Sequence, residues 1–145
     1  MKALIQRVTD ARVEVEGKTY SAINEGLLVF IGFDSKDNKV QADKMINKLL
    51  SYRVFNDAKD KMNLSVQDIN GDVMIVSQFT LSADTKSGNR PGFSTAKNPL
   101  EAETLYNYFV NQISKSYKNI ASGKFGSNMN ISLTNNGPVT FILSC

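Results

Sequence analysis

The start of the chain alternates between apolar and polar residues with the period of two that is typical of half-buried strands. Residues 2–8 predict a first strand. Val13 and Val15 then alternate with Glu14 and Glu16, which indicates that one face of this segment is buried and the other solvated. The opening of the chain is therefore predicted to be β-structure.

A turn and a fully apolar segment follow. Gly17-Lys18 predicts a turn into residues 19–23, which completes a β-hairpin. Residues 27–33 are continuously apolar apart from one glycine, a pattern that favours a strand covered on both faces.

Two segments carry the apolar spacing of an amphipathic helix. Asp37-Asn38 offers an N-cap to the first, and Asn98 caps the second, with Pro99 and Glu101 at its first and third helical positions as in a capping box. The apolar stripe of the first helix is Ala42, Met45, Ile46, Leu49 and Leu50. The stripe of the second is Ala102, Leu105, Tyr106, Phe109, Val110 and Ile113.

Short strands and turns are predicted between the two helices. Residues 52–55 and 64–67 favour short strands, and Asn70-Gly71 is the strongest hairpin dipeptide in the chain. It leads into residues 72–81, the best candidate for a central strand. The polar loop that follows, residues 82–98, has a length that favours a functional or mobile segment.

The last part of the chain predicts two more strands. Residues 129–133 and 139–143 are separated by Asn135-Asn136-Gly137-Pro138, which predicts a turn. No repeat or Pro/Gly/Ser linker divides the sequence. At 145 residues, with 41% apolar and 21% charged residues, the chain is predicted to form one α/β domain over residues 1–145, with two helices against a large set of strands.

The residue types that are missing restrict the chemistry. There is no His and no Trp, and the single Cys is Cys145. Without His the chain cannot build a Ser-His-Asp triad, a Cys-His dyad or an imidazole metal site. The carboxylates do not cluster in the sequence, so we expect no metal-dependent hydrolysis. Hydroxyls, amides, Lys, Arg or the backbone are left to carry any reaction.

Charge and the opening residues bear on location and partners. The formal net charge is +3 and no run of five like charges occurs, which permits a polyanionic partner without requiring one. The opening MKALIQRVTDARVEV has no unbroken apolar segment, and the apolar run at residues 27–33 is too short to cross a bilayer. We therefore expect a cytoplasmic protein without a membrane partner.

Ser77, Gln78, Phe79 and Thr80 place polar side chains at the end of an apolar strand. One interpretation is a strand whose polar face is solvated or hydrogen-bonded. The alternative is a strand end that opens into a pocket, where hydroxyl, amide and main-chain N–H groups surround a carbonyl oxygen and stabilise the negative charge that develops on it.

Asn135 to Thr140, with the sequence NNGPVT, also has two interpretations. Asn-Gly is a common turn dipeptide. Alternatively, a rigid Gly137-Pro138 presents two parallel carbonyl groups, because X-Pro bonds can be cis. Those carbonyls would hold an amino group in one chiral orientation.

Other candidates are weaker. Gly123-Lys124-Phe125-Gly126 lacks the phosphate-loop pattern and favours an ordinary turn. Arg7 alternates with apolar neighbours, which is usual for an edge residue with its stem along the surface. In the alternative interpretation, Arg7 lies beneath a loop and clamps it in place.

These segments resemble those of the D-aminoacyl-tRNA deacylases, also called D-tyrosyl-tRNA deacylases. The resemblance is carried by SQFTL at Ser77–Leu81 and NNGPVT at Asn135–Thr140. It is supported by the opening MKALIQRVTDARVEV, by GLLVFIGF, KMNLS and RPGFS, and by GKFGSNMNISLT directly before NNGPVT. The motifs occur in order over essentially the whole chain.

The resemblance implies the deacylase fold, with mixed β-sheets in β/β/α layers, and a homodimer that hydrolyses the ester of D-aminoacyl-tRNA and of mischarged glycyl-tRNA. It implies no metal and no cofactor. Gly137-Pro138 would be a cis dipeptide that enters the partner's pocket and rejects L-substrates. The aminoacyl ester would lie against Ser77, Gln78 and Phe79, with Thr80 proposed as a nucleophile in the family. The substrate and chirality site is expected to include Asn136, Arg7 and Met129.

The missing His argues against a Thr80 nucleophile, because such a group needs an activating base. We therefore expect direct attack by water. Binding of tRNA is expected to involve Lys86, Arg90 and Lys97 in the long loop, and Lys124, although all four also suit a solvated surface. Two other functions remain open from the residues alone: a tRNA-binding module without catalysis, and a dimerisation domain with a small-ligand pocket.

Overall fold

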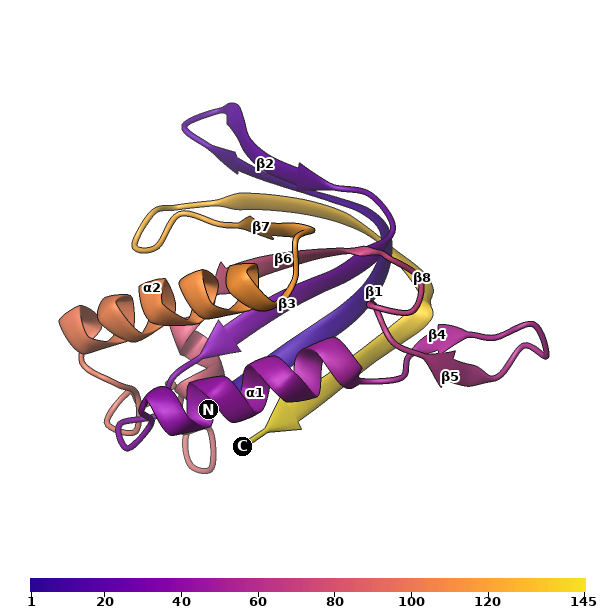
Figure 1. Cartoon of the computed structure of the whole chain (residues 1–145). Helices are drawn as coiled ribbons and strands as arrows, with labels where there is room; N and C mark the ends of the chain where they lie inside the picture. Colours follow the sequence, from indigo (N-terminus) through magenta and orange to yellow (C-terminus); the bar gives the residue numbers. More distant parts are fainter.

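One long strand at the centre of the molecule organises the sheet. The computed structural model describes all 145 residues (Figure 1). The strands are β1 (Lys2–Val15), β2 (Lys18–Ile23), β3 (Gly26–Gly32), β4 (Phe55–Asn56), β5 (Met62–Leu64), β6 (Asp72–Ser77), β7 (Ile120–Ser122) and β8 (Asn130–Ser144). The helices are α1 (Lys39–Ser51), α2 (Pro99–Ser116) and the 3-10 helix η1 (Phe79–Ser82).

The main sheet is mixed. Its order is β2-β1-β3-β6-β7, and β8 runs antiparallel to β1 over nearly its whole length. The β1–β2 and β1–β3 pairs are antiparallel, whereas β3–β6 and β6–β7 are parallel. The fold class expected from the sequence, a mixed α/β domain with two main helices, is confirmed.

The two faces of the central strands bury different side chains. One face packs on α1 and α2 and contributes Ile5, Leu27 and Ile75 to the larger core. The opposite face contributes a smaller core that includes Leu28 and Met74, and it is covered where β8 and the β1–β2 hairpin curl over the sheet. These are the β/β/α layers that the resemblance implies.

Both helices begin where the caps predict. The Asn38 side chain accepts a hydrogen bond from Val40 N–H, and Gln41 closes a capping box on it. Asn98 caps α2 through Leu100 N–H. Glu101, predicted to complete a second capping box, instead forms an ion pair with Lys97, with Nζ and Oε2 3.5 Å apart.

The predicted hairpin at Asn70-Gly71 is wrong. Asn70 has the positive φ of a turn residue (52°), but β6 leaves the turn to run parallel to β3 rather than antiparallel to β5. The predicted strand over 72–81 also ends early, at Ser77, where the chain turns into η1. The turn itself forms as its local chemistry predicts, but strand pairing depends on which partner the apolar face of β6 meets.

The predicted turn at residues 135–138 is also wrong. Residues 130–144 form one continuous strand, and both of its halves pair with β1. The irregularity that the Asn-Gly-Pro sequence introduces is taken up as two register shifts in this pairing. The Gly137-Pro138 peptide bond lies between the halves and is cis.

The short strands are displaced from their predicted positions. β4 begins at Phe55, directly after Val54, whose carbonyl accepts a hydrogen bond from Arg7 Nη1 at 2.8 Å. β5 ends before Ser65, whose N–H and hydroxyl both donate to the Asp68 carboxylate at 2.7 Å. No helix in the structure is long and apolar enough to cross a membrane.

Candidate functional site

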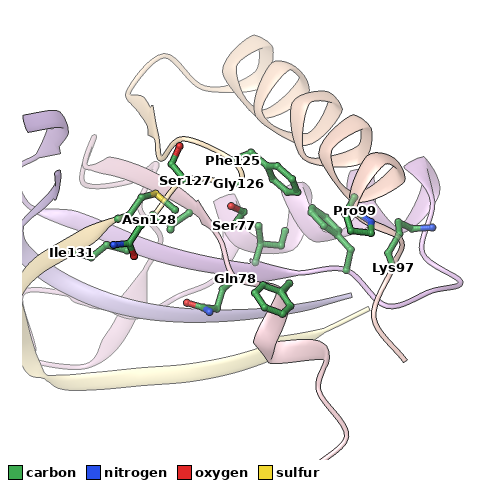
Figure 2. Close-up of a pocket in the computed structure, with 15 residues that line it drawn as sticks. Ser77, Gln78, Lys97, Pro99, Phe125, Gly126, Ser127, Asn128 and Ile131 are labelled. Carbon is green, nitrogen blue, oxygen red and sulfur yellow. The ribbon is translucent and has the colours of Figure 1, made fainter. Parts of the chain in front are cut away.

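A pocket of about 560 Å³ lies at the ends of β3 and β6, where they meet the start of α2 and the connection from β7 to β8 (Figure 2). Most of its wall is apolar, with Val76 and Ile131 among the side chains from the sheet. The polar side chains that reach it are Ser77, Gln78, Lys97, Ser127 and Asn128. An apolar cavity with a few convergent polar groups is the usual form of a small-molecule site.

Ser77 and Gln78 reach the pocket because β6 ends there. Ser77 is the last residue of β6 and pairs in register with Ile31 of β3. The main-chain N–H of Gln78 donates to the Ile31 carbonyl at 2.7 Å, which extends the ladder by one bond before the chain turns. Figure 2 shows Ser77 near the centre of the lining side chains and Gln78 at their lower edge, beside the turn into η1.

Gly32 is what allows η1 to pack on the end of β3. A Cβ at this position would lie 2.8 Å from the Gln78 carbonyl oxygen and 2.9 Å from the Cβ of Leu81. Neither atom is the flexible end of a long side chain. The glycine therefore permits the close approach that sets the position of Gln78 and Phe79 at the mouth of the pocket.

Thr80 differs from its three neighbours. It is exposed on η1 and is not among the residues that line the pocket. Its hydroxyl accepts a hydrogen bond from the side-chain amide of Gln78 at 2.6 Å. An amide is not a base at neutral pH, so this contact orients Gln78 without activating Thr80.

The wall opposite Ser77 is formed by Phe125, Gly126, Ser127, Asn128 and Met129. The buried hydroxyl of Tyr106 anchors this segment to α2, because the carbonyls of Ile75 and Gly123 lie 2.9 and 3.2 Å from it and share its proton. Burial raises the pKa of Tyr106 far above its usual range, so the hydroxyl stays protonated and able to donate. The Phe125 ring packs on the Tyr106 ring, with centroids 5.5 Å apart.

Lys97 lines the pocket, but its ammonium group is already engaged. Nζ donates to the carbonyl of Ser35 at 3.0 Å and faces the carboxylate of Glu101. The side chain is only 10% exposed. Lys97 therefore ties the loop before α2 to the loop before α1 and contributes chiefly its apolar stem to the cavity.

The segment Asn136-Gly137-Pro138, called the hook below, lies elsewhere on the sheet. It is exposed, and none of its residues lines the pocket of its own chain. Arg7 is buried beneath it and donates from Nε to the Asn136 carbonyl at 2.8 Å. The same guanidinium donates from Nη1 to Val54 and to Asn56, at 2.8 and 3.1 Å. Arg7 thus clamps the hook from below, the alternative that the sequence left open.

The conformation of Gly137 requires glycine. Its φ is +146°, and a Cβ there would lie 2.6 Å from Cγ2 of Val139 and 2.9 Å from the Val139 main-chain nitrogen. Arg7 Nη2 would be 3.3 Å away. The hook is therefore closely packed on its inner side although its outer side faces solvent.

The four basic residues predicted to bind tRNA do not form one patch. Lys86 and Arg90 lie on the exposed loop between η1 and α2, and Lys97 is engaged as described. Lys124 is exposed on the far side of Phe125. No group of three or more His, Cys, Asp or Glu side chains is arranged to hold a metal ion.

Sequence reasoning found Ser77, Gln78, Phe79 and Met129 but missed the segment from Phe125 to Asn128 as a pocket wall. The Gly123–Gly126 sequence indicated only a turn. Tyr106 appeared as one more apolar position of a helix, and no local pattern reveals that its hydroxyl is directed at the pocket wall. A Tyr in an otherwise aliphatic stripe is the one signal that would have suggested a buried hydrogen bond.

Comparison with known sequences agrees with this geometry. The profile of the family described as D-Tyr-tRNA(Tyr) deacylase matches residues 4–144. D-aminoacyl-tRNA deacylases of Pseudomonas putida, Pseudomonas fluorescens and Saccharophagus degradans are 50%, 52% and 52% identical to this chain. Each match covers 99% of the chain and 99% of the relative.

Solved structures share the fold. A protein described as c-Myc DNA Unwinding Element Binding Protein superposes with a TM-score of 0.96 at 40% identity, over 100% of this chain and 99% of the other. A probable eukaryotic D-amino acid tRNA deacylase superposes with a TM-score of 0.88 over 99% of this chain and 98% of the other. At 16% identity the second likeness supports the fold alone.

The fold and the matches define a hydrolase of the class that proofreads aminoacyl-tRNA. The chain belongs to the D-aminoacyl-tRNA deacylase family, which confirms the resemblance carried by its two motifs. Its activity is the deacylation of D-aminoacyl-tRNA.

Proposed function

We propose that this chain hydrolyses the ester of D-aminoacyl-tRNA by direct attack of water, with the carbonyl of the ester held against the end of β6. The observation that carries the proposal is the placement of Ser77 and Gln78 at the edge of a mainly apolar pocket in a chain without histidine. An aminoacyl ester is already activated, so positioning and stabilisation of the oxyanion can supply most of the catalysis.

Only some of the N–H and O–H groups at the end of β6 are free to donate a hydrogen bond to the oxyanion. The main-chain N–H of Gln78 is used by the Ile31 carbonyl, so it is not available. The Ser77 hydroxyl, the second N–H of the Gln78 amide and the N–H groups that begin η1 remain, because the first N–H groups of a helical turn have no partner within it. Loss of one such donor typically costs about 10²–10³ in rate.

The surroundings of Thr80 support a positioning role rather than a nucleophilic one. Its hydroxyl accepts a hydrogen bond from the Gln78 amide, which is not a base that could take up its proton. We propose that Thr80 holds the Gln78 amide in place. Isolation of a covalent aminoacyl-Thr80 species would refute this assignment.

We further propose that the hook, Asn136-Gly137-Pro138, selects D-substrates in the pocket of a second copy. Carbonyl groups on a rigid segment would accept hydrogen bonds from the α-amino group and leave no volume for an L side chain. Discrimination of this kind works by exclusion. Glycine has no side chain to exclude, so glycyl-tRNA is expected to be hydrolysed as well.

The homodimer is part of the same proposal. The hook is solvent-exposed and outside its own pocket, so it can serve a pocket only by reaching another molecule. Large apolar side chains are also exposed near both features, since Phe79 is 63% and Ile142 of β8 is 70% exposed. Such side chains are suited to burial between two copies related by a two-fold axis.

Recognition of the tRNA body is proposed to rest on phosphate contacts. Lys86 and Arg90 are free to make them, and Lys124 is as well, whereas the ammonium of Lys97 is held within the protein. Binding governed by such contacts weakens steeply as salt increases. An affinity insensitive to ionic strength would contradict this assignment.

The test of the proposed function is hydrolysis of three matched substrates, D-tyrosyl-tRNA, glycyl-tRNA and L-tyrosyl-tRNA, by the purified protein. We expect turnover of the first two and background rates with the third. Tight binding of D-tyrosyl-tRNA without turnover would instead indicate a binding module. Absence of tRNA affinity would indicate a dimerisation domain with a small-ligand pocket.

A further inference from the structure

A second concave surface adjoins the pocket on the far side of Phe125. This α2–β7 groove has a volume of about 670 Å³ and is open to solvent. Its lining is mainly polar, with Asn107, Asn111 and Ser114 along α2 and Ser122 on β7. Phe125 lines both the groove and the pocket, so the two cavities share one wall.

Two hydrogen bonds hold the groove in shape. The hydroxyl of Ser21 on β2 donates to the Ser122 carbonyl at 2.8 Å, which fixes the β1–β2 hairpin beside β7. Tyr106, in the groove floor, anchors Gly123 through the hydrogen bond already described. In Figure 1, α2, β7, the start of β8 and the hairpin that carries β2 lie in succession along this side of the molecule.

The side chains around the groove suit a single-stranded nucleic acid. Lys115 and Lys124 are both exposed and form no ion pair, and Glu103 is the one acidic lining residue. Tyr20 is 51% exposed at the rim, where its ring is available to a base. Proteins that bind single strands combine basic grooves that follow the backbone with aromatic rings on which bases stack.

The length of the groove also fits. The α2 residues that line it extend from Glu103 to Lys115, which is about 18 Å along the helix axis. At about 3.4 Å per stacked nucleotide of one strand, this span accommodates roughly five nucleotides. The 3′ end of a tRNA is single-stranded for a comparable length.

We propose that the α2–β7 groove binds the single-stranded nucleotides that precede the terminal adenosine of the tRNA, with Lys115 and Lys124 at their phosphates and Tyr20 stacked on a base. The proposal rests on the proposed function, because it takes the aminoacyl ester to lie in the adjoining pocket. The strand would then pass over Phe125 as it leaves the groove.

The test compares two substrates in the full-length protein: D-tyrosyl-tRNA and the D-tyrosyl ester of adenosine, which lacks the strand. In the Lys115→Ala, Lys124→Ala double variant we expect KM for the tRNA to rise about tenfold with kcat unchanged. The salt dependence of log kcat/KM should become shallower by roughly 1.4, or about 0.7 for each phosphate that a lysine no longer neutralises. Hydrolysis of the adenosine ester should not change.

Matched variants separate the groove from general charge effects. Lys44→Ala with Lys59→Ala removes the same charge from α1 and from the turn between β4 and β5, and should leave both substrates unaffected. Tyr20→Phe should retain affinity, whereas Tyr20→Ala should raise KM for the tRNA. The proposal is overturned if the groove variant leaves KM unchanged, impairs both substrates equally, or behaves like the Lys44, Lys59 control.

The experiments distinguish failure of the proposed function from failure of the proposal that the groove binds RNA. If the unaltered protein hydrolyses neither substrate, the proposed reaction is wrong. Direct binding of RNA then tests the proposal for the groove independently of hydrolysis. A fluorescent single-stranded RNA tetranucleotide should bind the unaltered protein and lose affinity about tenfold in the Lys115, Lys124 variant. No binding to the unaltered protein, or equal binding to both, overturns the proposal.

Discussion

The pocket and the hook are both rigidly built, yet they lie apart on the same chain. Ser77 and Gln78 are placed by the end of a parallel strand pair, and the hook is placed by the buried guanidinium of Arg7. Along β8, Ile131 lines the pocket and Gly137 lies six residues further, beyond the point where the pairing with β1 shifts register. On the proposed function, one chain therefore carries two half-sites: a pocket that receives the ester, and a hook that acts as a filter in the pocket of a second copy.

If the proposed function holds, that separation allows a small chain to discriminate strongly between D- and L-substrates. A filter that belongs to a neighbouring molecule does not need to be reached by a long loop of its own chain. It can be held on a strand and clamped from beneath. Arg7 does this with one hydrogen bond to the Asn136 carbonyl, while two others fix its guanidinium to Val54 and Asn56. The predictions below test whether the two half-sites act together, beginning with the largest expected effect.

Mixing two defective variants tests the pairing of half-sites directly. Ser77→Ala removes a donor to the oxyanion, and Gly137→Ala distorts the carbonyls proposed to hold the α-amino group. Each homodimer should therefore lose about 10²-fold or more of its D-tyrosyl-tRNA hydrolysis. In a two-fold dimer, an exchanged hybrid has one site made from both unaltered halves. Since half of the dimers in an equal mixture are hybrids with one good site of two, selective hydrolysis should recover to about a quarter of the normal value.

Recovery would be measured as D-tyrosyl-tRNA hydrolysis after subunit exchange, with each variant alone as the control. If pocket and filter belonged to the same chain, every dimer would remain defective. A mixture no more active than its components would therefore contradict the shared site.

A second comparison concerns two nearby hydroxyl groups, that of Ser77 in the pocket and that of Thr80 on η1. Ser77→Ala should lower kcat by about 10²–10³ because it removes a donor to the oxyanion. Thr80→Ala should keep activity within a few-fold, because it removes only a contact to the Gln78 amide. Steady-state kinetics on D-tyrosyl-tRNA would measure both, and a loss with Thr80→Ala as large as with Ser77→Ala would argue for a nucleophilic threonine.

Substitution of Arg7, which clamps the hook from beneath, is expected to have a smaller effect than substitution of Ser77 or Gly137. Arg7→Met removes the donor to the Asn136 carbonyl, so the hook should loosen and hydrolysis of L-tyrosyl-tRNA should rise about tenfold relative to the D-substrate. Asn56→Ala is the matched control, because it removes a partner of Arg7 that is not part of the hook. The ratio of D to L rates should change only in the first variant.

The smallest effect is expected on the pocket wall. Tyr106→Phe keeps the ring against Phe125 but removes the proton shared by the carbonyls of Ile75 and Gly123. Thermal unfolding should report a loss of about 1–2 kcal/mol, and KM for the adenosine ester should rise a few-fold with little change in kcat. A drop in kcat comparable to that of Ser77→Ala would instead place the Tyr106 hydroxyl in contact with the reacting group.

Much of the architecture could be predicted from local patterns. The two helices begin at the predicted caps, Asn38 and Asn98, and bury the predicted stripes except for Val110, which is half-buried. The continuous apolar run at residues 27–33 does form a strand covered on both faces. These features depend on side chains a few residues apart, so their physical causes are visible in a short window of sequence.

The errors share a different cause. Asn70 adopts the turn conformation that its sequence favours, but β6 pairs with β3, which is distant in the chain. The Asn-Gly-Pro segment favours a turn locally, but pairing of both flanking segments with β1 holds it in one strand. In each case a long row of hydrogen bonds to a remote strand outweighs a local preference.

The sequence by itself determined the chemistry that this protein can use: no imidazole, hydroxyl and amide groups at the end of β6, and a Gly-Pro pair far along the chain. Only the tertiary structure decided that Phe125 to Met129 close the pocket, that Tyr106 secures them, and that the hook lies beyond the reach of its own pocket. Residue types set which bonds can form, whereas the pairing of distant strands sets which groups meet.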